Sequence, residues 1–218
     1  KLNIAGDSEN IHINVNESNS TLVVGSIDNN VHDLNIGNIS INNNELNIIP
    51  KQNMIIEHAN LFKNSTLSFI QDSSQETGNA IIKSVTIKKG SGSKISNFTI
   101  LNQLIIESSS SCLIDENVVY TSTEFVFYFG KHQKITDTYL KFSNKVSQMP
   151  SKIHVLENKN KEFLDDIDDD RIIIIHQNNS ILDKHMCVEW AKLIDNNKGL
   201  CITNDPYNDG DNSVYAYK

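Results

Sequence analysis

Residues 34–50 read LNIGNISINNNELNIIP, and this stretch shows the pattern that most of the chain repeats. Apolar residues alternate with polar ones on a period of two at 34–36, 39–41 and 46–48, and three asparagines at 42–44 separate the last two segments. Successive side chains of a β-strand point to opposite faces, so this alternation is typical of half-buried strands, whereas asparagine favours turns. The stretch therefore predicts short strands joined by polar turns.

The same alternation extends from residue 11 to about residue 129. Polar stretches such as Gly90-Ser91-Gly92-Ser93 and residues 108–111 separate the apolar segments and are interpreted as turns. A strand about every eight to twelve residues is typical of an all-β sandwich or a solenoid. The alternating segments are 11–15, 22–24, 34–36, 39–41, 46–48, 54–56, 67–69, 85–87, 98–100, 104–106, 118–120 and 125–127.

Three features favour the solenoid. Most segments offer only two or three apolar positions on one face, fewer than sandwich strands commonly carry. The hairpin signal Asn-Gly is absent from the sequence, and Asp209-Gly210 is its single Asp-Gly. Asn and Ser recur beside the apolar pairs, where stacked polar side chains could satisfy the turns. We therefore expect a mainly β fold, an irregular right-handed parallel β-helix (β-solenoid) over residues 1–130, with an antiparallel β-sandwich as the alternative.

One segment has the spacing of a known repeat: Ile36-x-x-Ile39-x-Ile41-x-x-Asn44-x-Leu46-x-x-Ile49-Pro50. It resembles the leucine-rich repeat, in which the Asn side chain hydrogen-bonds the backbone across the loop. The match ends at residue 50 and is not repeated, and a single repeat cannot bury its own apolar face, so a leucine-rich horseshoe is not expected. In texture rather than in motif, the chain resembles the irregular β-helices of surface adhesins and polysaccharide-acting proteins.

The pattern changes in residues 131–218. The continuous apolar run 172–175 predicts a strand buried on both faces. A helix is expected from an N-cap at Ser180 to about Ile194, followed by the stop signal Lys198-Gly199 and a strand at 200–203. We expect this region to hold the end of the solenoid and a small C-terminal α/β cap, or the start of a second small domain.

Charge and composition restrict the function. The 218 residues carry 19 Lys and Arg against 27 Asp and Glu, a formal net charge of −8. A net negative chain without a basic cluster offers little attraction to a phosphate backbone, so nucleic acid is not an expected partner. The printed chain begins with Lys and has no apolar run long enough for a membrane helix. We expect a fragment of a longer parent chain that could itself carry a membrane anchor.

Six Asn-x-Ser/Thr sequons suit a secreted glycoprotein, and we therefore expect an extracellular or cell-surface location. The odd number of cysteines, three, allows at most one internal bridge. Cys187 and Cys201 are the candidate pair, and two buried free thiols are the alternative. The candidate glycosylation sites are Asn16, Asn19, Asn38, Asn64, Asn97 and Asn178.

A search for catalytic motifs finds no nucleophile elbow, zinc-protease helix or phosphate-binding glycine loop. The Asp-rich residues 165–170 are interpreted as solvated surface. Asp205, Asp209 and Asp211 have the Asp-Gly of a calcium loop but depart from the EF-hand pattern. They are therefore weak candidates for metal ligands, and a plain turn is the preferred interpretation. No metal or other cofactor is expected.

Aromatic residues are concentrated at 120–139. Alternation places Phe125, Phe127 and Phe129 on one face, which is most simply core, and Tyr128 on the other. Together with Tyr120 and Tyr139, Tyr128 could form an outward stripe that stacks on sugars or anchors a partner.

These features predict a non-enzymatic extracellular recognition module, part of the ectodomain of a surface adhesin, lectin or receptor. Its expected partner is a protein or glycan on another surface, besides the adjacent domains of the parent chain. One alternative is a carbohydrate-active β-helix enzyme, a polysaccharide lyase or hydrolase that uses the C-terminal carboxylates. A second alternative is a structural spacer that only stacks against neighbouring domains.

Overall fold

The structure is a computed structural model of the chain. It describes residues 8–16, 20–24, 34–50, 53–70, 78–115, 117–129, 139–144, 146–157, 171–177, 189–190, 192–194, 199–202 and 212–217.

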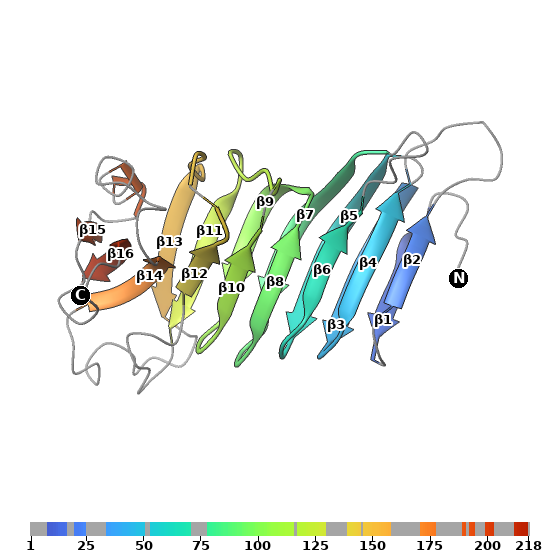
Figure 1. Cartoon of the computed structure of the whole chain (residues 1–218), viewed down its shortest axis with the longest axis horizontal. Helices are drawn as coiled ribbons and strands as arrows, with labels where there is room; N and C mark the ends of the chain where they lie inside the picture. Colours follow the sequence, from blue (N-terminus) through green and yellow to red (C-terminus); the bar gives the residue numbers. More distant parts are fainter. Residues whose placement is uncertain are drawn as a thin grey trace.

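The described chain is mainly β and is arranged in two sheets that face each other along the long axis of the molecule (Figure 1). The first sheet contains β1 (Ser8–Val15), β3 (Leu34–Asn42), β5 (Met54–Phe62), β7 (Ala80–Ile87), β9 (Thr99–Ile106), β11 (Glu124–Phe129) and β13 (Lys152–Glu157). The second contains β2 (Ser20–Val24), β4 (Glu45–Pro50), β6 (Thr66–Phe69), β8 (Gly92–Ser96), β10 (Ser111–Ile114), β12 (Tyr139–Phe142), β14 (Arg171–Gln177), β16 (Asn212–Tyr217) and β15 (Gly199–Ile202).

From β1 to β14, consecutive strands alternate between the two sheets, and within each sheet a strand pairs with the strand two places along the chain. From β1 to β14 every described pairing is parallel. The expectation of a mainly β fold is confirmed, and the alternative of an antiparallel sandwich is wrong for this part of the chain. Parallel neighbours cannot be joined by a tight hairpin, which agrees with the missing hairpin signals.

The core lies between the sheets, where the inward side chains of successive strands meet in register. One row on the first sheet is Ile39, Ala59, Val85, Leu104, Phe125 and Ile153, each at most 1% exposed. The facing row on the second sheet is Leu46, Leu67, Ile95, Ile114 and Phe142. The period-two pattern of the sequence identifies six of these inward positions, namely Ile39, Leu46, Leu67, Val85, Leu104 and Phe125.

Some element boundaries differ from the sequence prediction. The segments 34–36 and 39–41 belong to one strand, β3, and the segments 98–100 and 104–106 both fall at β9. The segment 118–120 forms only an isolated bridge between Val119 and Thr99. Gly92 and Ser93, expected in a turn, begin β8, where they pair with Ser111 and Cys112 of β10. The inward Ser93 hydroxyl donates to the Lys63 carbonyl oxygen at 3.3 Å.

The turns that lead from the first sheet to the second share a backbone conformation. Positive φ angles occur there at Asn43, Lys63, Gly90 and Ser109. The Asn44 side chain donates to the carbonyl of Asn42 at 2.8 Å, a local bond within its own turn. The segment that resembles a leucine-rich repeat thus spans most of β3, the turn after it and β4, and the two strands belong to different sheets.

The opposite turns contain a column of asparagines. Asn53 and Asn79 come one residue before the paired positions Met54 and Ala80, and Asn97 and Asn117 come two residues before the bridged positions Thr99 and Val119. The Asn97 side chain donates to the Phe69 carbonyl at 2.9 Å and accepts from Asn117 at 3.3 Å. The expectation of stacked polar side chains between strands is confirmed at these positions.

At the C-terminal end, β16 lies between β14 and β15 and is antiparallel to both. Of the helix expected from Ser180 to about Ile194, the structure describes residues 189–190 and 192–194. Glu189, Trp190 and Lys192 are helical, whereas Leu193 lies in a turn and Ile194 forms a bridge with Ile153. Trp190 is fully buried, and the next residues continue into the main fold, since Ile153 N donates to Leu193 O at 3.0 Å. This segment covers the end of the core beside β11 to β13.

Candidate ligand-binding face

The three tyrosines proposed as a binding stripe have different surroundings. Tyr120 is 3% exposed, and its ring lies 5.3, 5.8 and 6.3 Å from those of Phe125, Phe142 and Trp190. Burial raises the pKa of the Tyr120 hydroxyl well above its usual range. The expectation that Tyr120 faces outward is wrong, because the 118–120 segment is not a strand and its ring turns into the aromatic end of the core.

Tyr128 is half-buried on the outer side of β11, opposite Phe125 and Phe127, which are both 0% exposed. This arrangement is the one that alternation predicted. Tyr139 begins β12, but its side chain lies outside the described residues, as does that of Phe129.

Several other candidates also fall outside the described residues. These are Cys187, Asp205, Asp209 and Asp211, together with the side chain of Cys201. Cys112 is a buried free thiol of β10. Within the described ranges, no group of three or more His, Cys, Asp or Glu side chains could hold a metal ion.

Among the candidate glycosylation sites, Asn19 and Asn178 lie outside the described residues. Asn16 and Asn64 are exposed. Asn38 accepts a hydrogen bond from Asn60 at 2.9 Å, and the Asn97 amide takes part in the asparagine column. The amides of Asn38 and Asn97 therefore already link neighbouring strands.

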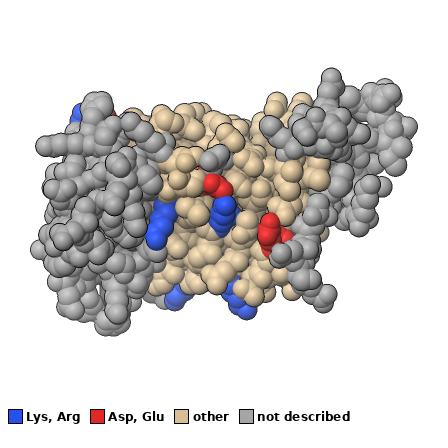
Figure 2. Space-filling model, in the orientation of Figure 1, with Lys and Arg blue, Asp and Glu red and all other residues tan. Residues whose placement is uncertain are grey.

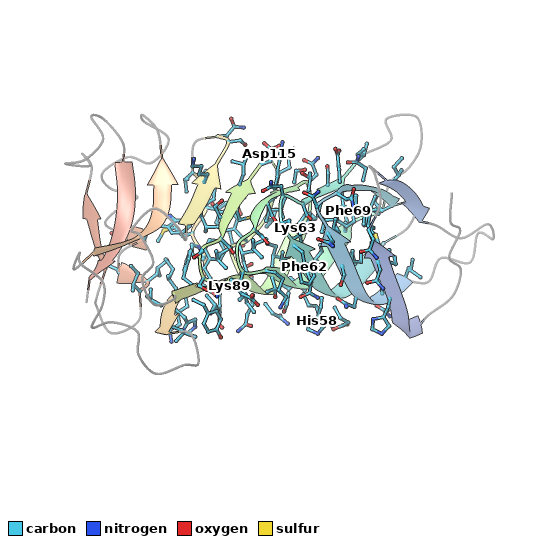
Figure 3. The ribbon with its side chains drawn as sticks, turned by 90° about the horizontal axis from the view of Figure 1, so that it is seen from below. His58, Phe62, Lys63, Phe69, Lys89 and Asp115 are labelled. Atoms are coloured by element: carbon cyan, nitrogen blue, oxygen red, sulfur yellow. The ribbon has the colours of Figure 1, made fainter. Side chains whose placement is uncertain are left out.

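The outer side of the first sheet, which we call the odd-strand face, carries hydrogen-bonding side chains in register. Neighbouring strands lie about 4.8 Å apart, so each row offers a new side chain at that spacing. Its first row is His12, Asn38, His58, Ser84, Gln103, Glu124 and Lys152. In Figure 3, His58 projects from this face and Asp115 from the opposite face of the molecule.

A second row runs beside the first and changes character along the molecule. It begins with Asn14, Ser40, Asn60 and Thr86, and continues with Ile105, Val126 and His154. The first four of these side chains are hydrogen-bonding groups without charge. This half of the face therefore suits a ligand that offers hydroxyl or amide groups rather than charge.

Two adjoining hollows lie on the odd-strand face. One, of about 680 Å³, is lined by side chains that include His12, Asn38, His58, Asn60, Lys83 and Thr86. At its edge Lys83 Nζ lies 2.6 Å from Glu57 Oε1, so the two charges neutralise each other. The other hollow, of about 470 Å³, lies beside Tyr128 and shares Thr86 with the first. Both volumes fall in the range of about 300–1,000 Å³ that is usual for ligand sites.

The outer side of the second sheet is different. Figure 2 shows this side with few charged groups among its described residues. Glu45, Thr66, Lys94, Leu113 and Lys141 occupy one register row, and Lys94 Nζ pairs with Asp115 Oδ2 at 2.5 Å. The hollows that contain His58 and Tyr128 lie on the odd-strand face, which is therefore the better candidate for a binding surface.

Within the described part of the chain, no helix is both long and apolar enough to cross a membrane. Comparisons of the chain with models of protein families, with curated protein sequences and with solved structures found no match.

The alternation of residues 125–129 placed Tyr128 on the outer side of its strand, but nothing in the sequence indicated the rows around it. Each row collects single polar residues from strands far apart in the chain, such as His58 and Gln103. The available signal was the recurrence of Asn, Ser and His between inward apolar residues, but that signal does not say which of them share a row.

Proposed function

We propose that the two parallel sheets form a β-solenoid, and that the chain is a non-enzymatic recognition module of an extracellular or cell-surface protein. It binds an extended ligand along the odd-strand face. The observation that carries the proposal is the in-register array of His12, Asn38, His58, Ser84 and Gln103 beside a second polar row.

The outward side chains of this face repeat from strand to strand, and this repetition supports the proposal. A solenoid offers an extended surface in which each coil adds one set of side chains. A ligand that crosses several strands can accept several hydrogen bonds, each worth about 0.5–1.5 kcal/mol net. Affinity then accumulates over the length of the face without a deep pocket. The module acts within a parent chain, whose neighbouring domains adjoin it.

The test compares the two faces of the molecule. A triple variant, His58→Ala, Asn60→Ala and Thr86→Ala, removes polar groups from the odd-strand face. The matched control, Thr66→Ala, Ser68→Ala and Lys94→Ala, removes polar groups from the outer side of the second sheet. Each protein is produced without glycosylation, since Asn38 stands on the face, and is screened on a glycan array and on intact cells, with and without calcium.

We expect the unmodified chain to bind at least one glycan or cell surface. The odd-strand variant should lose about tenfold or more in affinity, since about 1.4 kcal/mol corresponds to tenfold, and the control should bind normally. The proposal is wrong if the chain binds nothing in either screen, or if both variants lose binding equally. Circular dichroism of each variant confirms that the fold is retained.

A further inference from the structure

A third outer row lies along the edge of the odd-strand face where the chain turns towards the second sheet. Asn42 pairs with Phe62, and Tyr128 pairs with Leu156. Between these two pairs, Lys88 N donates to Leu61 O at 2.8 Å, and Glu107 N donates to Ile87 O at 3.0 Å. These bonds extend the parallel pairing by one residue, so Lys88 follows Phe62 in the row and Glu107 follows Lys88. The row, which we call the aromatic strip, is Phe62, Lys88, Glu107, Tyr128 and Leu156.

The strip combines exposed apolar side chains with an ion pair. Phe62 is 37% exposed and Leu156 is 41% exposed, two of the five large hydrophobic residues exposed among those described. Tyr128 is half-buried and lines the hollow of about 470 Å³ together with Lys88, Lys89, Ile105 and Glu107, of which the exposed Lys89 belongs to the turn after β7 and not to the strip. Two aromatic rings thus stand on either side of a charged pair.

The ion pair is held in place and leaves little net charge. Lys88 Nζ lies 2.9 Å from Glu107 Oε1, and the other carboxylate oxygen accepts from the backbone amide of Lys89 at 2.9 Å. A half-exposed pair of this kind contributes little stability, but it offers a positioned donor and acceptor at the centre of the strip. A ligand with a net charge gains no attraction from a neutral pair.

We propose that the aromatic strip binds a linear oligosaccharide of neutral sugars, which lies across the strands with sugar rings over Phe62 and Tyr128. A pyranose ring has an apolar C–H face that packs on an aromatic ring and a rim of hydroxyls that hydrogen-bonds to polar groups between the rings. The rings belong to β5 and β11, three strand spacings apart, or about 14 Å. One disaccharide cannot cover both rings, whereas a hexasaccharide can.

A bound peptide fits these observations less well. Extended peptides gain main-chain hydrogen bonds by pairing with the edge of a sheet, whereas the strip crosses strands whose backbone groups are already paired. The net charge of −8 further disfavours acidic polymers such as polyuronides. The ligand class therefore follows from the neutrality of the strip and the spacing of its rings.

The proposal rests on the proposed function, and the experiment separates the two. Binding of neutral hexasaccharides of glucose, mannose and N-acetylglucosamine, of their disaccharides and of a hexagalacturonate is measured by calorimetry. The proteins are the unmodified chain, Phe62→Ala/Tyr128→Ala, and the control Ile70→Ala/Leu101→Ala. The control removes two other exposed apolar side chains, 40% and 38% exposed.

We expect at least one neutral hexasaccharide to bind, and to bind about tenfold or more tightly than its disaccharide. The strip variant should lose about tenfold or more of that affinity, and the control should lose little. Preference for the hexagalacturonate, equal losses in both variants, or no binding of any neutral hexasaccharide would overturn the strip proposal. In that last case, cell-surface binding that is sensitive to the His58, Asn60 and Thr86 substitutions would leave the general recognition function intact.

Discussion

Cys112 and Tyr120 show how the core acts on single ionisable residues. Cys112 is 0% exposed in β10, and Tyr120 is 3% exposed among aromatic rings. Burial raises the pKa of both groups well above their usual ranges, because the apolar surroundings disfavour the thiolate and the phenolate. Both groups therefore stay protonated in the folded state at pH values where the unfolded chain would ionise.

This difference predicts a loss of stability in alkali. Unfolded Cys and Tyr ionise near about pH 8.5 and 10, so above those values the unfolded state releases protons that the native state retains. The contribution is fully present below the unfolded pKa values and is lost as the pH rises towards the folded ones. We expect the free energy of unfolding, measured with urea, to fall from pH 8 to pH 10.5.

The control for this prediction is the double variant Cys112→Ala/Tyr120→Phe, in which neither position ionises. Its stability should be lower at pH 7 because it loses packed atoms, yet it should decline less steeply with rising pH. Equal slopes for the two proteins would show that ionisation of these residues does not contribute. The comparison of slopes also removes the contributions of other ionising groups, which both proteins share.

At the scale of the element, the turns between the sheets define each strand. Lys63 has a φ of 54° in the turn after β5, and Gly90 has a φ of 73° in the equivalent turn after β7. A left-handed conformation costs a residue other than glycine about 1–2 kcal/mol. The repeated turn therefore imposes strain at Lys63 that a glycine would not carry.

We expect Lys63→Gly to raise the free energy of unfolding by up to about 1 kcal/mol. The relief of strain exceeds the extra backbone entropy of glycine, about 0.5–1 kcal/mol. The neighbouring exposed Asn64, which is not among the positive-φ residues, provides the control. Asn64→Gly should lower stability by about 0.5–1 kcal/mol. Urea unfolding measures both changes, and equal destabilisation by the two substitutions would contradict the prediction.

At the scale of the whole molecule, contacts link each strand mainly to its neighbours in the same sheet. Trp190 closes one end, where its ring lies 5.7 Å from Phe125 and 5.9 Å from Phe142. In a stack of this kind, stability is approximately the sum of local terms. A substitution that destabilises this end should therefore lower the local stability of the nearest strands most.

We expect Trp190→Ala to increase amide hydrogen exchange strongly in β11, β12 and β13 and only slightly in β3 and β5. Replacing a buried Trp by Ala typically costs about 3–5 kcal/mol. Leu156→Ala in β13 is the control, since Leu156 is 41% exposed and should change stability by about 0.5 kcal/mol or less. Uniform loss of protection along the whole chain would show that the molecule unfolds as a single unit instead.

The sequence predicts more of the fold than of the candidate binding face. Alternation identified inward residues such as Ile48 and Ile87, because a strand with one buried face must alternate. It marked 118–120, where Val118 and Tyr120 are indeed buried but the chain forms a bridge instead of a strand. It missed β8 and β10, where Ser93 and Cys112 occupy inward positions. Small inward residues give no apolar signal, so only the neighbouring strands reveal their role.

The alternation of apolar and polar residues is enough to predict that this chain forms many short strands with polar turns, and which side of most strands faces the core. The alternation of β1 to β14 between two sheets, and the outward side chains that meet in a row, follow from the pairing of strands in the folded molecule. Register partners such as Ile82 and Ile100, or Phe125 and Ile153, are separated by unequal lengths of chain. The periodicity within a strand is local, whereas the rows that could bind a ligand depend on pairing between strands, which the lengths of the intervening turns set.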